Sequence, residues 1–168
     1  TVKGTNANTY TAKANLKDKV NTVWKDGTTT EKEIEWKIVR FRLVDATIAT
    51  VQAQEYTGNA IKPEPRVTVE LTTGNTTVLT KGTDFEYSYT NNKNVGTATI
   101  TITGKGNYQS QKSIEFVIEK KKVAIPTAIA DKTYNGQEQS ITAGDGYNLT
   151  GTVKGTNANT YTAKANLK

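Results

Sequence analysis

The side chains of this chain that could do chemistry are carboxylates, lysines and aromatic rings, because histidine, cysteine and methionine are absent. Without histidine and cysteine, Ser-His, Cys-His and thiol catalysis and the usual zinc sites cannot be built. The sequence also has no G-x-S-x-G motif, no P-loop and no dinucleotide-binding glycine pattern. We therefore predict no catalytic residue and no cofactor-binding residue, and we expect the chain not to be an enzyme.

The 16 carboxylates are scattered and form no acidic motif. Glycoside hydrolysis needs two acids facing each other across a cleft, and calcium needs several converging oxygens, typically from an Asp-rich loop. Asp26 in Lys-Asp-Gly and Asp145 in Gly-Asp-Gly are isolated, and each is better explained as a turn-forming residue. No metal ligand and no cofactor are predicted, and an acid pair or calcium site assembled by the fold stays an open alternative.

A crosslink between lysine and asparagine is a further chemistry that the composition allows, because both residue types are abundant. Such a crosslink needs a buried carboxylate beside the two reacting groups. Period-two alternation places Glu33, Glu35, Glu115 and Glu119 on the outer faces of their strands. The pattern therefore disfavours a crosslink and leaves it as an open alternative.

The aromatic rings could line a sugar-binding face, because amphipathic rings suit carbohydrate contacts. Trp36 alternates with glutamate and lysine, which is the pattern of a core residue, whereas Trp24 lies next to a turn and is the ring most open to exposure. A binding face should display at least two rings together, and a spacer should bury nearly all of them. The candidate rings are Trp24, Trp36, Tyr87, Tyr89, Tyr108, Tyr134 and Tyr147.

The net charge of +6 and the pI of 9.4 do not indicate a nucleic-acid partner. Lys154, Lys164 and Lys168 lie in a segment without acids and account for half of this charge. The other lysines are spread along alternating strands, and the only run, Lys120–Lys122, falls between two strands. No apolar run is long enough to cross a bilayer, so we expect no membrane insertion in this segment.

The chain carries an internal repeat that organises everything else. Thr1–Lys17 and Thr152–Lys168 are identical, TVKGTNANTYTAKANLK, which sets a period of 151 residues. A fixed period is typical of tandem repeat proteins. We therefore interpret the chain as one period of an array plus a short overlap.

Every apolar pattern in the chain has the period of a β-strand, and none has that of a helix. Ile34, Trp36 and Ile38 share one face, and after Ile38 the apolar register flips, which predicts a module boundary near residue 42. Turn signals follow at the spacing of an all-β sandwich. The predicted segments are 1–42, a complete module at 43–120, and 121–168. The strands of the complete module are expected near 46–51, 66–71, 76–79, 84–90, 97–103 and 113–118.

The inward positions of these strands are predicted to be structural core residues. In the outer segments they are Tyr10, Leu16, Ile34, Trp36, Ile38, Tyr161 and Leu167. In the central module they are Val67, Val69, Phe85, Tyr87, Ile100, Ile102, Ile114 and Phe116.

The sequence resembles known bacterial surface repeats over almost its whole length. The central module resembles bacterial immunoglobulin-like repeats in three stretches: YTGNAIKPEPRVTVE, Lys81–Tyr108 and IEFVIEK. The outer segments are similar to the MBG type of these repeats in KTYNGQEQSI and VWKDGTTTEKEIEWKI. Both occur in cell-surface adhesin or stalk proteins of Gram-positive gut Firmicutes. The resemblance implies tandem immunoglobulin-like β-sandwich modules in an elongated array. Residues 1–42 would be the C-terminal part of an MBG-like module and 121–168 the N-terminal part of the next.

The expected function is that of an extracellular stalk, spacer or fibre subunit for adhesion on the bacterial cell surface. The alternative is that the repeats themselves bind host glycans or matrix proteins. The expected partners are neighbouring repeats or other copies of the chain, arranged head to tail. Because 1–42 and 121–168 each represent part of a module, we expect them to be completed by another copy or by covalent neighbours in a longer chain.

Overall fold

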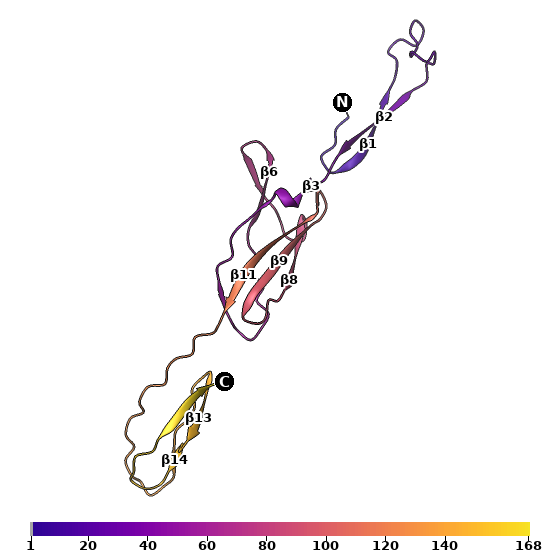
Figure 1. Cartoon of the computed structure of the whole chain (residues 1–168). Coiled ribbons are helices and arrows are strands. Elements are labelled where there is room, and N and C mark those ends of the chain that lie inside the picture. Colours follow the sequence, from indigo (N-terminus) through magenta and orange to yellow (C-terminus); the bar gives the residue numbers. More distant parts are fainter. Residues whose placement is uncertain (1) are drawn as a thin grey trace. The chain divides into compact units, whose positions relative to one another are not determined.

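The computed structural model describes residues 2–168; Thr1, the first residue of the predicted 1–42 segment, lies outside the described residues. The described chain is all-β, as predicted, and its only helical element is the short 3-10 turn Leu43–Asp45. It divides into two compact units, Thr1–Lys120 and Lys121–Lys168. The sheets of both units are shown in Figure 1.

The first unit opens with a hairpin. β1 (Asn8–Ala14) pairs antiparallel with β2 (Lys32–Ile38), and this register places Tyr10 opposite Trp36. The two rings stack with their centroids 4.7 Å apart. The hairpin therefore buries aromatic surface between its own two strands.

Residues 41–120 build two further sheets and a short parallel pair (Figure 1). The four-stranded sheet has the order β5 (Gln54–Glu55), β11 (Gln111–Glu119), β9 (Gly96–Gly104), β8 (Phe85–Thr90). The three-stranded sheet has the order β4 (Thr47–Ile48), β6 (Val67–Thr72), β7 (Asn75–Val78), and β3 (Phe41–Arg42) pairs with β10 (Tyr108–Gln109). This arrangement is consistent with a β-sandwich.

The core of the chain lies within residues 43–120. One buried cluster joins Val67 and Val69 of β6 to Phe85 of β8 and Ile102 of β9, and so connects the two sheets. A second cluster contains Ala98, Ile100, Phe116 and Ile118. Six of the predicted core positions are buried here: Val67, Val69, Phe85, Ile100, Ile102 and Phe116. Tyr87 and Ile114 pack against these clusters and are partly buried.

The core positions predicted for the outer segments are exposed or only partly buried in the structure. Ile34, Tyr161 and Leu167 are 54%, 42% and 77% exposed, so these three predictions are wrong. Ile34 and Leu167 lie in two-stranded sheets, which cover a side chain only on the side of the partner strand, and Tyr161 lies outside any strand. The remaining predicted positions, Tyr10, Leu16, Trp36 and Ile38, are partly buried.

Two details of the central module also depart from the predicted pattern. The strand expected near residues 46–51 is reduced to β4, and the 3-10 turn comes directly before it. Leu71, which follows the alternation of Val67 and Val69, is 49% exposed. A β-bulge between Glu70 and Thr72 shifts the register there and ends the inward row.

Two tyrosines of β8 hold the Pro63–Pro65 segment. Tyr89 donates its hydroxyl to the carbonyl of Pro63 at 2.9 Å, and the Tyr87 hydroxyl donates to the carbonyl of Pro65. Burial, together with the nearby Tyr89 and Glu64, raises the pKa of Tyr87 to about 12. These bonds satisfy carbonyls of a segment that contains no strand.

The second unit consists of two small sheets. β12 (Gln139–Ser140) pairs with β14 (Lys154–Gly155), and β13 (Tyr147–Gly151) pairs with β15 (Ala163–Leu167). No side chain among its residues is fully buried. The apolar side chains of the unit therefore stay at least partly exposed.

Trp36 should contribute less to stability than a fully buried core residue. Trp36→Ala removes the stack on Tyr10, and such aromatic pairs contribute about 0.5–1.5 kcal/mol beyond their area burial. We expect faster amide hydrogen exchange in β1 and β2 and unchanged exchange in β9. Equal acceleration in β9 would show that Trp36 supports the central core. Lys37→Ala, at an exposed neighbouring position, is the matched control.

Candidate functional site

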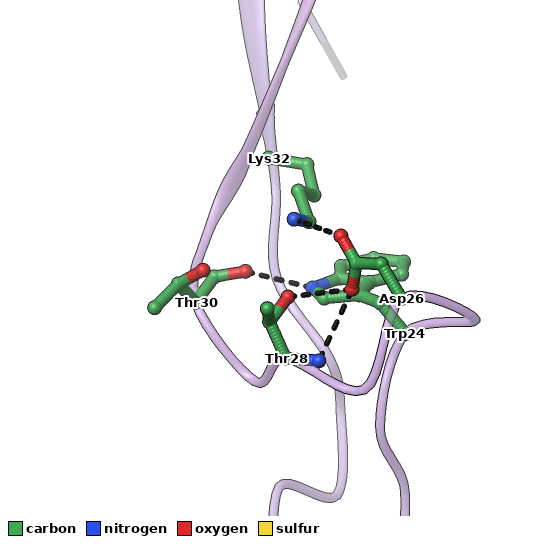
Figure 2. Close-up of polar contacts among 5 residues, drawn as sticks. All are labelled: Trp24, Asp26, Thr28, Thr30 and Lys32. Carbon is green, nitrogen blue, oxygen red and sulfur yellow. Dashed lines mark hydrogen bonds and ion pairs between the residues drawn. The ribbon is translucent and has the colours of Figure 1, made fainter.

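A cluster of polar contacts lies in the loop between β1 and β2 and at the start of β2 (Figure 2). Asp26 Oδ1 accepts hydrogen bonds from the Thr28 backbone N–H at 3.1 Å and from its hydroxyl at 2.7 Å. Asp26 Oδ2 pairs with Lys32 Nζ at 2.6 Å. The Trp24 indole N–H donates to the Thr30 carbonyl at 2.7 Å. Asp26 thus forms a turn, as the sequence indicates, and all of its contacts are local.

The electrostatics of this loop agree with a structural role. Hydrogen bonds from Lys32 and then from Thr28 lower the pKa of Asp26 to about 2. A catalytic acid or base near neutral pH needs a pKa shifted toward the working pH, and Asp26 is shifted away from it. This loop can fix a turn, and it offers no acid or base poised for catalysis.

The low pKa of Asp26 makes the loop sensitive to acid. Since the folded pKa lies below the ordinary value of 3.8, the ionised carboxylate stabilises the loop above about pH 4. That contribution is lost as the pH falls through about 2. Lys32→Gln should move the Asp26 midpoint upward toward 3.8 in an NMR titration of the carboxyl carbon, and Lys25→Gln should not. An unchanged midpoint in Lys32→Gln would contradict the assigned ion pair.

A hollow in the second unit has a volume of about 780 Å³. It lies between the Pro126–Lys132 segment and the sheet strands β13, β14 and β15. Its lining mixes polar groups with the side chains of Ile129, Ile141, Leu149, Val153, Tyr134, Tyr161 and Ala163. Tyr134 is 61% exposed and Tyr161 is 42% exposed. The hollow could take an apolar strand face or a ligand with a flat apolar face.

The other candidate rings occupy positions of different kinds. Tyr108 is buried, and Tyr87, Tyr89, Tyr147, Trp24 and Trp36 are partly buried. The two tryptophans both use their rings within the β1–β2 hairpin region. Of the predicted candidate rings, only Tyr134 is highly exposed among the described residues, and it shares the hollow with Tyr161, which was predicted to be a core residue.

The charged side chains form surface pairs. Lysine–carboxylate pairs such as Lys105–Glu86 at 3.0 Å and Lys154–Glu138 at 3.1 Å join partners that are about half exposed or more. No charged side chain is buried in residues 2–168, and no group of three or more acidic side chains there could hold a metal ion. Within the described part of the chain, no helix has the length and apolarity needed to cross a membrane.

Sequence reasoning missed the partners that the fold supplies. Thr30 and Lys32 complete the loop around Trp24 and Asp26, and the hollow brings Tyr134 close to the repeat segment containing Tyr161. The sequence does contain a signal for the contacts of this loop, namely the Asp-Gly turn with a lysine six residues after Asp26. No local pattern signals the hollow, because its lining comes from separate segments. No protein-family model, curated protein or solved structure matches this chain.

Proposed function

We propose that the chain is a structural repeat segment of an extracellular bacterial surface protein. In this proposal, tandem immunoglobulin-like and MBG-type modules form an elongated array that acts as a stalk, spacer or fibre subunit for adhesion. The array belongs on the bacterial cell surface, and its partners are neighbouring repeats. The proposal includes no enzymatic activity.

The observation that carries the proposal is the identity of Thr1–Lys17 and Thr152–Lys168. Both copies contribute a strand to a small antiparallel sheet, β1 in the first unit and β15 in the second. Repeat units of this kind are used where length is needed, because each unit contacts mainly its neighbours. The half-exposed ion pairs and the locally bonded loop around Asp26 fit a solvated scaffold.

Two measurements test this function. Antibodies against the chain should label intact cells of the source bacterium without permeabilisation. The chain itself should bind neither a glycan array nor immobilised mucin and matrix proteins. Labelling only after permeabilisation would exclude a surface location, and specific binding would exclude a role limited to spacing.

A second candidate function is supported by the exposed pair Tyr134 and Tyr161. Both line the hollow of the second unit, and two rings in one hollow are the minimum expected of a carbohydrate-binding face. In that case the repeats themselves would bind host glycans. Tyr134→Ala should then abolish glycan binding, whereas Tyr56→Ala in the central module should leave it unchanged.

A further inference from the structure

The two identical segments share one tyrosine contact in the two units, although their strands cover different residues, Asn8–Ala14 in the first and Lys154–Gly155 and Ala163–Leu167 in the second. Tyr10 donates its hydroxyl to the Asn6 carbonyl at 2.6 Å, and the equivalent Tyr161 donates to the Asn157 carbonyl at 2.8 Å. In both copies the ring lies against the glycine six residues earlier, where a Cβ atom would clash with it. The same segment therefore makes the same tyrosine–carbonyl and tyrosine–glycine contacts in both units.

The strand partners of the two copies are different. β1 pairs with β2, which follows it in the chain. β15 corresponds to residues 12–16 of the first copy and pairs with β13, which precedes it. Ala12–Ala14 therefore pair with the strand that follows them, whereas the equivalent residues Ala163–Ala165 pair with the strand that precedes them. Each copy uses one partner strand where a central strand would use two.

The two pairings use opposite edges of the strand. In the first copy, the Thr9 backbone N–H donates to the side chain of Asn8 at 2.9 Å and not to β2. By alternation, the backbone N–H and C=O groups of Thr9, Thr11 and Lys13 point to the strand edge away from β2. In the second copy, Thr162, the equivalent of Thr11, accepts from the Thr152 N–H at 3.0 Å on the β13 side. Because N–H and C=O groups of alternate residues point to opposite edges, both partners can bind one strand at once.

Side chains that are partnered in the first copy lack those partners in the second. Lys13 pairs with Glu31 at 2.8 Å and lies 3.9 Å from Glu33, near the start of β2. The equivalent Lys164 has no ion pair among the described residues, and nothing stacks on Tyr161 as Trp36 stacks on Tyr10. The free edge of the second copy therefore has the charge and aromatic surface that fit the β2 sequence.

The exposed face of β2 fits the same place. Ile34 is 54% exposed and lies opposite Ala12, whose equivalent Ala163 lines the hollow of the second unit. A β2 strand on the free edge would place Ile34 and Trp36 beside Ala163 and Tyr161. This would extend the apolar face that borders the hollow, and it would cover side chains that are exposed in both units.

We propose that the free edge of β15 binds the Lys32–Ile38 strand of the following repeat unit. The segment Asn159–Leu167 then becomes the central strand of a three-stranded antiparallel sheet, with Tyr161 opposite Trp36 and Lys164 opposite Glu33. This inference rests on the proposed function, because the following unit exists only in a tandem array. The interface is specific, since its register is the one that β1 and β2 already use.

The test adds the missing strand to the full chain. Residues 1–168 are followed directly by a second copy of Asp18–Arg42, and amide hydrogen exchange is compared with that of the unextended chain. Exchange at Tyr161, Ala163 and Ala165 should slow by about tenfold or more, because these amides face the free edge. Ile34→Pro in the added copy removes one donor from the new ladder and should abolish the protection. Unchanged exchange in the extended chain would overturn the proposal.

A disulfide test fixes the register, since the natural chain has no cysteine. Thr162→Cys in the chain should form a disulfide with Glu35→Cys in the added copy, because these residues are directly opposite in the proposed sheet. Lys37→Cys in place of Glu35→Cys is two residues out of register and should form far less. Equal yields from the two pairs would overturn the register.

Sedimentation distinguishes the source of the strand. The extended chain should remain monomeric while its free edge is protected. If the extended chain instead associates as its concentration rises, and the amides of its own added copy stay unprotected, a second chain supplies the strand. That result would overturn the proposal. Glycan binding or failure of cell-surface labelling would instead contradict the proposed function, and neither result changes the exchange rates measured at β15.

Discussion

Replacing Phe85 with alanine should lower the free energy of unfolding of residues 43–120 by about 3–5 kcal/mol, the range for a buried large aromatic residue. Phe85 is 2% exposed and lies in the cluster that joins the two sheets. Its ring also makes an edge-to-face contact with Tyr87, with the centroids 5.0 Å apart. The loss combines the transfer of a large apolar group with a cavity between two sheets.

Native-state hydrogen exchange at Ile100 and Ile102 would measure this loss, because the central strand β9 reports the global opening of the module. Thr97→Ala on the same strand is exposed and should cost less than about 0.5 kcal/mol. Similar losses for Phe85→Ala and Thr97→Ala would mean that the two sheets do not meet through Phe85.

Gly104→Ala should destabilise the same module by about 1–3 kcal/mol, the usual range for overpacking. A Cβ atom at Gly104 would lie 2.7 Å from the backbone nitrogen of Gln109 and 2.8 Å from the carbonyl carbon of Tyr108. These are backbone atoms, so they cannot move aside as the end of a flexible side chain can. The Gly104 N–H also donates to the Ser110 carbonyl at 3.0 Å, which any shift of the strand would weaken.

The Gly104→Ala variant should show its largest changes at β10 and at its parallel partner β3. Amide exchange at Phe41, whose N–H donates to the Asn107 carbonyl at 2.9 Å, is the local readout. Thr97→Ala, at the other end of β9, serves again as the control and should leave Phe41 unchanged. Normal stability and normal exchange at Phe41 would contradict the close backbone approach.

Much of the central module could be predicted from sequence because its alternation is strong. Phe85–Thr90 and Gly96–Gly104 are strands whose inward residues, such as Ile100 and Ile102, are buried as the period-two pattern predicts. The pattern failed at Leu71, because a bulge inserts one extra residue and alternation carries no signal for it.

The candidate site was less accessible to sequence reasoning. Asp26 could be assigned to a turn because its contacts to Thr28 lie within two residues. The exposure of Tyr161 could not be predicted, because alternation shows which face a residue is on and not whether a second sheet covers that face. The hollow likewise depends on segments that only the fold brings together.

The repeated segment separates what sequence determined from what tertiary structure decided. Its sequence alone determines the local contact of the tyrosine, because Tyr10 and Tyr161 bond a carbonyl four residues away in both units. The strand that pairs with it was decided by tertiary structure, since β1 takes β2 and β15 takes β13. A β-strand has two equivalent hydrogen-bonding edges, and its own residues do not specify which distant segment occupies each edge.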